Sequence, residues 1–411
     1  MKIAIVGGGI GGLTLALALQ ARGLSATVFE QAPAIREVGV GINTLPHAIR
    51  VLADLDLLDR LDAIGVRTRS LVYKTARGQN IIAQPRGTWA GYDVPQFSIH
   101  RGMLQRVLAD AVAERCGADA VQVGHTLTRF TPGSDGVDAT FTPADGAART
   151  ERFDVLVGAD GIHSTVRRHF APDEGAPRWS GIVMWRGATW TPPFADGQTM
   201  IIAGGLSTKL VLYPIHCDPA RPGETLMNWV ICARIAPDGA PLAMIDDWSR
   251  TASADDVLPH VTGQIAIDEV DVAALIAATP DIYVYPMADR DPLPRWTDGG
   301  ATLLGDAAHP MYPVGSNGAS QAILDATALS RHLAAAGVAG LAAYEAERRP
   351  QTAEIVTMNR AGGPERVIDL VEARAPDGFD DLHAVASRAE IEAIVGGYQT
   401  IAGFTVADVN A

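Results

Sequence analysis

A run of glycines directly after an apolar segment at the N-terminus constrains the fold more than any other feature. Residues Lys2–Val6 are rich in β-forming side chains and apolar after the first, as expected of a buried parallel strand. The run Gly7–Gly12 comes next, and the Ala- and Leu-rich segment Leu13–Arg22, which ends at Gly23, is typical of a helix. A second strand is expected over Ala26–Glu30. Together these segments predict a βαβ unit.

The spacing within the glycine run indicates a dinucleotide site. Gly7, Gly9 and Gly12 stand in G-x-G-x-x-G register, and Gly11 lies between the last two. In this pattern one glycine closes the tight turn, the second lets the backbone approach a pyrophosphate, and the third allows close packing of helix against strand. Glu30 ends the second strand, where a carboxylate can accept hydrogen bonds from ribose hydroxyls. This motif alone is compatible with NAD and with FAD.

Two later motifs favour FAD. Asp160 lies in the run Gly158–Gly161, directly after the apolar segment Phe153–Val157, and Asp306 lies in Leu303–Pro310. An acid at the carboxyl end of a strand suits a hydrogen bond to a ribitol hydroxyl, and a nicotinamide dinucleotide has no ribitol. Each acid taken singly is more often a cap or turn residue. The two motifs in this order after the glycine run indicate FAD.

Composition and charge disfavour several other classes of protein. The chain has 33 basic and 47 acidic residues, a net charge of −14, and no concentrated basic segment, so a nucleic-acid partner is not expected. No uninterrupted apolar stretch is long enough to span a membrane. The three cysteines form no pair motif, which favours a reducing cytoplasm, and the ten histidines show no metal-ligand spacing, so no metal is expected.

The order of the predicted elements indicates a mixed α/β (α+β) fold in which one domain interrupts another. A Rossmann-like FAD-binding domain is expected over residues 1–171 and 291–355. A largely antiparallel β-sheet domain that binds the substrate is inserted over residues 172–290, where strand-like stretches carry several aromatic residues. Residues 356–411 are expected to form a C-terminal helical segment.

Further motifs carry a family resemblance. They are Gly39–Asn43, Ser98–Gly102, Met184–Gly187, Tyr285–Met287, Asp289–Pro292, Met311–Pro313 and Gly318–Gln321. With the motifs above, they make the chain resemble the single-component FAD-dependent aromatic hydroxylases, a group that includes the p-hydroxybenzoate and salicylate hydroxylases. The motifs are most similar to those of the phenazine-modifying members, and the C-terminal helices match only loosely.

The resemblance implies a reaction and several residue roles. It implies that FAD, oxygen and either NADH or NADPH are used to hydroxylate an aromatic or heteroaromatic substrate, whether phenolic, carboxylated or phenazine-like, through a flavin C4a-hydroperoxide. It also implies that Arg101 contacts FAD, that Asp160 serves both FAD and the reduced nucleotide, and that Asp306 holds the ribitol. A monomer or a homodimer is expected.

The segment Pro313–Ala326 departs from the pattern of many family members. Ser316 and Asn317 stand where glycine and glutamine are usual, and the phenazine-type members share this altered loop. Independently of the family, a glycine-rich loop that leads into an apolar helix presents free backbone N–H groups at the helix N-terminus. We expect Gly318 and Ala319 to direct these groups at the flavin and to stabilise its reduced form.

No motif identifies a general base. Tyr213 and His216, on one predicted strand, are the candidate catalytic residues, and the alternatives are a core aromatic and a surface histidine. Arg186 can meet a substrate carboxylate or form an ordinary ion pair. The candidate substrate contacts are Trp185, Arg186, Tyr213, Met287, Tyr312 and Asn317.

Two other functions share the predicted fold. One is an FAD-dependent dehydrogenase or reductase, and the other is a non-catalytic FAD-fold protein that binds a small molecule or a partner. The Asp160 motif and Met184–Gly187 match the hydroxylases better than the dehydrogenases. The sequence therefore favours an NAD(P)H-dependent monooxygenase.

Overall fold

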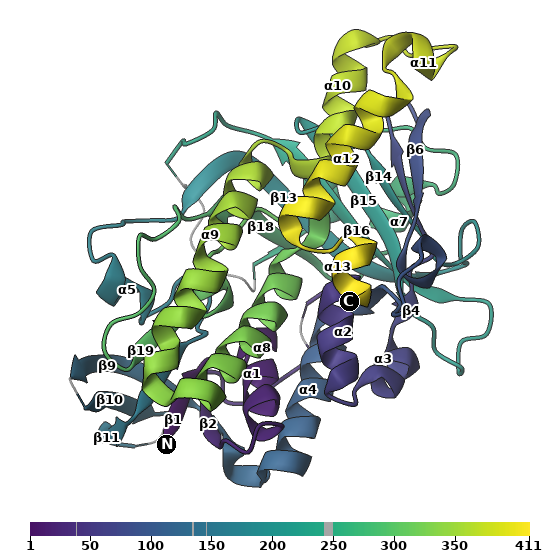
Figure 1. The fold of residues 1–411 in the computed structure, drawn as a ribbon. Helices are drawn as coiled ribbons and strands as arrows, with labels where there is room; N and C mark the ends of the chain where they lie inside the picture. Colours follow the sequence, from purple (N-terminus) through teal and green to yellow (C-terminus); the bar gives the residue numbers. More distant parts are fainter. Residues whose placement is uncertain (38, 134, 145, 242–249) are drawn as a thin grey trace.

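The glycine run lies in a five-stranded parallel sheet with the strand order β19-β12-β1-β2-β8. The computed structural model describes residues 1–37, 39–133, 135–144, 146–241 and 250–411 (Figure 1). In agreement with the predicted βαβ unit, β1 leads into helix α1 and β2 follows. The strands of this sheet are β1 (Ile3–Val6), β2 (Ala26–Glu30), β8 (Val121–Val123), β12 (Val155–Gly158) and β19 (Ala301–Leu303).

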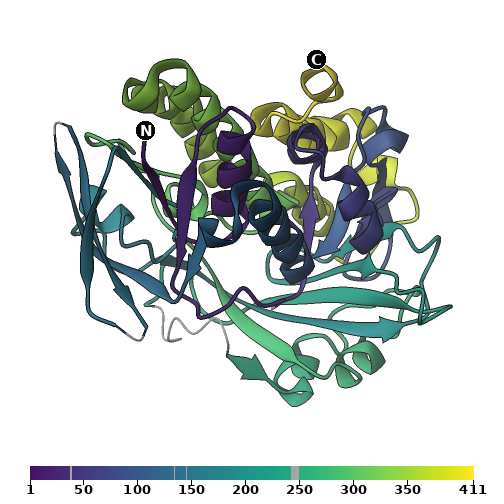
Figure 2. The same ribbon diagram turned by 90° about the horizontal axis from the view of Figure 1, so that it is seen from below.

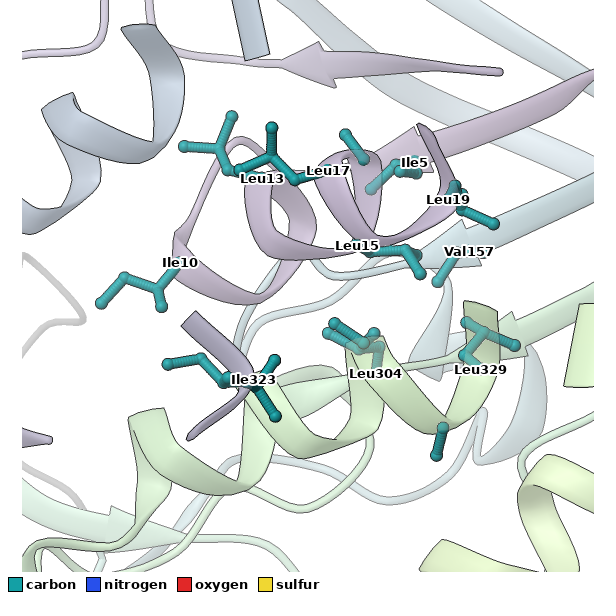
Figure 3. Packing of buried hydrophobic residues seen from close by; sticks show 14 of the residues in the cluster. Ile5, Ile10, Leu13, Leu15, Leu17, Leu19, Val157, Leu304, Ile323 and Leu329 are labelled. Carbon is teal, nitrogen blue, oxygen red and sulfur yellow. The ribbon is translucent and has the colours of Figure 1, made fainter. Parts of the chain in front are cut away.

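Helix α1 (Ile10–Gln20) is the centre of the first hydrophobic core. It begins inside the glycine run rather than at the predicted Leu13, and its residues from Ile10 to Leu19 are all buried. It packs against α4 (Arg101–Cys116) and α8 (Gly318–Ala336). Figure 3 shows side chains of β1, α1 and α8 meeting in this core. Because α1 is apolar on all sides, it is held between the sheet and the other helices.

Two small antiparallel sheets accompany the parallel one. The first consists of β9 (His125–Gly133), β10 (Gly136–Pro143) and β11 (Arg149–Phe153). The second consists of β3 (Gly41–Thr44), β4 (Val66–Arg67) and β7 (Phe97–His100). The second sheet brings the Gly39–Asn43 and Ser98–Gly102 motifs together, since Gly41 pairs with His100.

An eight-stranded sheet with the order β17-β18-β13-β16-β15-β14-β5-β6 forms the second half of the molecule. Its pairings are antiparallel except that of β5 with β14. Its strands are β5 (Ser70–Lys74), β6 (Asn80–Pro85), β13 (Arg178–Thr191), β14 (Thr199–Ala203), β15 (Thr208–His216), β16 (Thr225–Arg234), β17 (Thr251–Ala252) and β18 (Ile282–Asp289). The largely antiparallel sheet is therefore present, but β5 and β6 come from outside the predicted 172–290 segment. The domain boundaries stay a prediction.

Helices cover both faces of this large sheet. One face packs on α6 (Ala254–Val257) and α7 (Val272–Ala277), which Figure 2 shows on the outer side of the sheet. The opposite face packs on α10 (Arg366–Arg374) and α12 (Arg388–Ala402). The remaining helices are α2 (Pro46–Asp54), α3 (Leu58–Ile64), α5 (Arg167–Phe170), α9 (Gly340–Arg360), α11 (Leu382–Val385) and α13 (Val406–Asn410). None of the helices in the described ranges is long and apolar enough to cross a membrane.

Candidate functional site

In the first motif, some glycines pack closely against other parts of the protein, and one faces open space. Gly7 has a φ of +111°, and a Cβ there would lie 2.3 Å from the backbone oxygen of Ala159. A Cβ on Gly12 would lie 2.1 Å from the backbone oxygen of Gly7, and one on Gly11 would lie 2.6 Å from Leu304. A Cβ on Gly9 would meet nothing within 4 Å. The turn is therefore tight on its protein side and open where a pyrophosphate has to approach.

Glu30 lies beside this turn at the end of β2. One oxygen of its carboxylate accepts a hydrogen bond from the Gly8 backbone N–H at 2.7 Å, and the other accepts one from the Ala32 N–H at 2.8 Å. A carboxylate has about four acceptor positions, so both oxygens keep capacity for further donors such as ribose hydroxyls.

Arg101 and Asp306 are two exposed charged side chains from motifs that are expected to bind the cofactor. Arg101 is the first residue of α4, and Asp306 lies in the 3₁₀ turn after β19. Neither side chain hydrogen-bonds or ion-pairs with any other residue in the described parts of the chain. Nearby protein removes part of the water around Asp306 and raises its pKa, against the opposing effect of His309 and Arg101. A free acceptor and a free cation suit the ribitol and phosphates of FAD.

Asp160 has a different environment, because its carboxylate is used within its own turn. It accepts hydrogen bonds from the Ser164 hydroxyl at 2.5 Å and from the Thr165 N–H at 2.7 Å. Burial raises the pKa of Asp160, although these hydrogen bonds act in the opposite direction. The carboxylate thus shapes the turn that follows β12, and its direct contact with FAD or reduced nucleotide stays a prediction.

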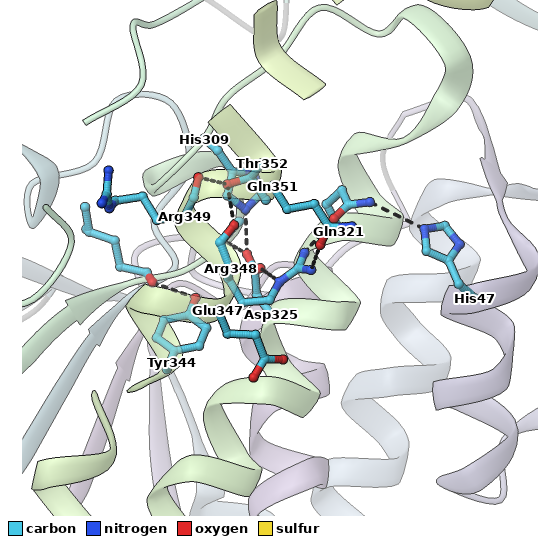
Figure 4. A network of polar contacts seen from close by, with 12 residues as sticks. His47, His309, Gln321, Asp325, Tyr344, Glu347, Arg348, Arg349, Gln351 and Thr352 are labelled. Carbon is cyan, nitrogen blue, oxygen red and sulfur yellow. Dashed lines mark hydrogen bonds and ion pairs between the residues drawn. The ribbon is translucent and has the colours of Figure 1, made fainter. Parts of the chain in front are cut away.

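A buried polar network holds the turn that carries Asp306 (Figure 4). Asp325 of α8 accepts hydrogen bonds from the Gly305 N–H at 3.0 Å, from His309 at 2.5 Å and from Arg348 of α9 at 2.7 Å. Arg348 also donates to Gln321 at 2.5 Å. Burial favours the neutral form of Asp325, but His309 and Arg348 outweigh it and lower its pKa to about 2. The network ties the carboxyl end of β19 to two helices.

The loop before α8 has the geometry expected of a flavin-facing helix N-terminus. A Cβ on Gly318 would meet only Met311, at 3.9 Å, so the start of α8, including Ala319, borders open space. Gly315 and Ser316 have φ values of 67° and 55°. A positive φ explains why glycine is usual at the position of Ser316.

A buried ion pair fixes this loop from behind. Glu365 accepts a hydrogen bond from the Gly315 N–H at 3.1 Å with one oxygen and pairs with Lys209 of β15 through the other. Both charged side chains are almost fully buried. The C-terminal segment therefore positions the loop before α8.

The backbone of Gly41 in β3 forms hydrogen bonds with three polar side chains of the large sheet. Its carbonyl accepts hydrogen bonds from Arg186 at 2.6 Å and from the Tyr213 hydroxyl at 2.9 Å, and its N–H donates to Asn228 at 2.7 Å. Burial raises the pKa of Tyr213 above its ordinary value, with Arg186 opposing. A tyrosine that donates to a backbone carbonyl can act as a positioning group, and a catalytic role for Tyr213 stays a prediction.

The other catalytic candidate lies at the end of β15. The Nδ1 atom of His216 is 3.0 Å from the backbone oxygen of Ile64, and its ring lies edge-on to Trp190. His216 is partly exposed, in accord with the surface alternative, and a catalytic role for it stays a prediction.

The predicted contact of Trp185 with substrate needs correction. Successive residues of a strand point to opposite faces, and Arg186 points toward Gly41. Trp185 instead stacks on His260, with ring centroids 4.8 Å apart, within the core under α6 and α7. It therefore lies on the far side of the sheet from the cofactor motifs.

The remaining substrate candidates lie near the flavin-facing loop but are largely buried. Met287 and Tyr312 pack together with Val314, and the Tyr312 hydroxyl has no hydrogen-bond partner in the described part of the chain. Burial, with a smaller effect from Asp289, raises the pKa of Tyr312 to about 12. The Asn317 carboxamide oxygen accepts from Gln321 at 3.2 Å, which directs this side chain into the polar network.

A cavity adjoins the same loop. Its empty space of about 410 Å³ includes open solvent, and the cavity touches Gly315 and Ser316. Its other walls come from β5, β14 and the C-terminal helices, through Leu71, Tyr73, Met200, Ile202, Tyr398 and Phe404, with Arg86 and Gln96 as polar members. Sequence reasoning missed these residues, which come from four distant segments and belong to no motif.

Comparison with known proteins identifies the class. The model of the FAD-binding domain family matches residues 1–359. The open glycine turn and the unpaired Arg101 and Asp306 fit that cofactor. The chain belongs to the single-component, FAD-dependent aromatic hydroxylases.

Two relatives show how near the likeness is. The chain is 45% identical over 365 residues to the phenazine 1,6-dicarboxylic acid hydroxylase PhzS of Lysobacter antibioticus, covering 87% of this chain and 89% of that protein. It is 34% identical over 364 residues to the 3-amino-4-hydroxybenzoate 2-monooxygenase of Streptomyces cremeus, covering 86% and 85%.

Among solved structures, the substrate complex of a salicylate hydroxylase has a TM-score of 0.73 at 22% identity and covers 98% of each chain. This likeness supports the fold. Together, the findings confirm the predicted family, fold class and FAD cofactor. The enzyme is a monooxygenase that uses NAD(P)H and oxygen, which excludes the dehydrogenase and the non-catalytic alternatives.

Proposed function

We propose that the enzyme hydroxylates a fused-ring heteroaromatic acid of the phenazine type. The observation that carries this proposal is the 45% identity to a phenazine dicarboxylic acid hydroxylase over most of both chains. The cavity beside the loop before α8 supports it through its lining, which brings apolar side chains of β5, β14 and the C-terminal segment together next to Gly315 and Ser316. Its walls are mainly apolar, as a flat aromatic ring requires.

Bound FAD supplies electron transfer from NAD(P)H and the activation of oxygen. In our proposal, the glycine turn and Glu30 hold the adenosine half, Arg101 holds the phosphates and Asp306 holds the ribitol. The N–H groups at the start of α8 direct partial positive charge at the flavin ring, where they favour its anionic reduced form. The apolar cavity walls position the aromatic ring and exclude water.

Substrate choice can be tested with the purified holoenzyme. Phenazine, quinoline and benzene carboxylic acids would be screened for stimulation of NADH and NADPH oxidation, and products would be identified by mass. We expect a phenazine acid to give the highest kcat/KM and a product heavier by one oxygen atom. Preference for a single-ring acid would reject the phenazine proposal while leaving the hydroxylase class intact.

Two variants should distinguish the residues that bind FAD from those that control its reactivity. Asp306→Ala removes one hydrogen bond to a charged group, worth about 1.5–3 kcal/mol, so FAD should bind about ten- to a hundredfold more weakly. Gly318→Val adds a side chain in open space at the start of α8, so it should keep FAD but slow its reduction and release more hydrogen peroxide without product.

The measurements for this pair are FAD titration by fluorescence and the ratio of product formed to NAD(P)H consumed. If Asp306→Ala keeps unaltered FAD affinity and loses only hydroxylation, Asp306 is not a ribitol ligand.

We also propose a cytoplasmic enzyme that acts as a monomer or a homodimer. Cys116, Cys217 and Cys232 are all unpaired, which suits a reducing compartment. NAD(P)H is available in the same compartment.

A further inference from the structure

Arg86 is a buried arginine without an acidic partner. It follows β6, is only 7% exposed and lines the cavity beside the flavin-facing loop. One terminal nitrogen donates to the Gln84 side chain at 2.9 Å, while Nε has no hydrogen-bond partner in the described ranges. No Asp or Glu of those ranges forms an ion pair with it.

This arrangement is costly unless an anion completes it. A buried charge is tolerated when it is paired and fully hydrogen-bonded, and an unsatisfied guanidinium N–H loses its water without compensation. The planar guanidinium presents several N–H groups in the geometry that matches a carboxylate. The group that Arg86 lacks is therefore an acceptor, and a carboxylate is the natural one.

A second unsatisfied polar group lies in the same wall. Gln96 is 2% exposed, and its side-chain oxygen has no hydrogen-bond partner in the described ranges. Together with Arg86 it makes one end of the cavity polar, whereas Leu71, Met200 and Phe404 line it with apolar surface. The cavity thus has an apolar body for a ring, a cationic end, and an edge formed by the Gly315–Ser316 turn.

We propose that Arg86 binds the carboxylate of the aromatic acid substrate and so determines which ring compounds the enzyme accepts. This inference rests on the proposed function, in which the substrate is an aromatic acid. It differs from the expectation that Arg186 meets the carboxylate, because Arg86 lines this cavity whereas Arg186 lies at Gly41 and is not among the residues that line it.

The orientation of the substrate follows from this placement. The polar end and the turn before α8 border the same cavity, so the acid group points toward β6 and the ring extends toward the flavin-facing loop. Tyr398 of α12 and Phe404, which lies between α12 and α13, also line the cavity. The C-terminal segment therefore forms part of the substrate site.

The test is binding of matched acids and amides to the FAD-loaded enzyme. The probes are benzoate, quinoline and phenazine carboxylates, each paired with its neutral carboxamide, and the readout is the dissociation constant from the change in flavin absorbance without NAD(P)H. We expect Arg86→Met to weaken binding of the preferred acid about ten- to a hundredfold. Binding of its amide should change much less.

Two further variants control for folding. Arg86→Lys keeps a positive charge and should retain part of the preference for acid over amide, even if Arg86→Met folds poorly. Arg77→Met removes an exposed arginine from the same β5–β6 hairpin, whose partner is Asp377, and should leave both dissociation constants unchanged. The acid-to-amide ratio within one preparation does not depend on the fraction of folded protein.

The proposal would be overturned if no acid binds the unaltered enzyme more tightly than its amide, or if Arg86→Met weakens acid and amide equally. Loss of the preference in Arg186→Met but not in Arg86→Met would also overturn it and assign the carboxylate to Arg186. Failure of the proposed function looks different: the acids bind with the predicted preference, but none is hydroxylated.

Discussion

Gly12→Val is expected to yield protein with essentially no bound FAD and a large loss of stability. A Cβ on Gly12 would lie 2.1 Å from the backbone oxygen of Gly7 and 3.2 Å from Ile5. The first contact is with backbone, so no side-chain rotation can relieve it, and α1 has to move away from β1. This movement would open the turn that approaches the pyrophosphate. FAD content after purification and the midpoint of thermal unfolding measure the two effects.

Two other glycines are matched controls for Gly12. Gly9→Ala places its methyl group in open space, so the apoprotein should fold normally while FAD binding weakens. Gly397 is exposed in the middle of α12 and also faces open space, so Gly397→Ala should raise stability by about 0.5–1 kcal/mol and keep FAD. Full FAD content and normal stability in Gly12→Val would contradict the packing role of Gly12.

Asp325→Ala is expected to cost about 3–5 kcal/mol of unfolding free energy and to release FAD. Asp325 is fully buried and accepts from Arg348, His309 and the Gly305 N–H, so its removal leaves a buried guanidinium uncompensated. The Gly305 contact also positions the turn that carries Asp306. Chemical denaturation of the apoprotein gives the stability change, and FAD titration gives the change in affinity.

The pH dependence of the free energy of unfolding should show whether Asp325 is ionised in the folded protein. A carboxyl whose pKa falls from about 3.9 in the unfolded chain to about 2 in the folded one stabilises the fold above the unfolded value, and the contribution disappears as the pH falls toward 2. Asp325→Asn should lack this acid-dependent component. Asp377→Ala, which removes a fully exposed acid paired with Arg77, should leave the pH profile unchanged. Identical profiles for Asp325→Asn and the unaltered protein would contradict an ionised Asp325.

Sequence reasoning predicted the cofactor half of the molecule well, because its signals are local. The glycine run, its flanking strands and the acids after β12 and β19 each lie within a few residues of the element that positions them. Strand β2 has the predicted bounds Ala26–Glu30. The neighbours of these strands in the sheet, with β12 beside β1 and β19 beside β12, come from pairings between distant parts of the chain.

The large sheet was harder to predict, for two physical reasons. Strands β5 and β6 join the large sheet because β5 pairs with β14, with Ser70 opposite Thr199. Residues so far apart in the sequence leave no local pattern that would predict their pairing. Strand β13 is covered on both faces, so Ile182–Trp185 is buried without alternation. Alternation of apolar and polar residues is the sequence signal that distinguishes the two faces of a strand. Because β13 lacks this alternation here, the sequence does not show which face of the sheet carries Trp185.

The substrate cavity could not be predicted because its walls come together only in the folded chain. Arg86 follows an edge strand, Met200 lies in the middle of the sheet, and Tyr398 lies in a C-terminal helix. None of the three belongs to a motif. The structural signal for Arg86 is that no acid among the described residues pairs with it, which only the fold reveals.

Isotope labelling tests the central claim, that the enzyme is an FAD-dependent hydroxylase of an aromatic acid. The holoenzyme would be incubated with NAD(P)H and the preferred aromatic acid, once under ¹⁸O₂ and once in H₂¹⁸O. An FAD-dependent hydroxylase should give one ¹⁸O atom in each product molecule under ¹⁸O₂, none from labelled water, and one NAD(P)H consumed for each product formed. Product oxygen derived from water, or oxidation of the acid without oxygen incorporation, would contradict it.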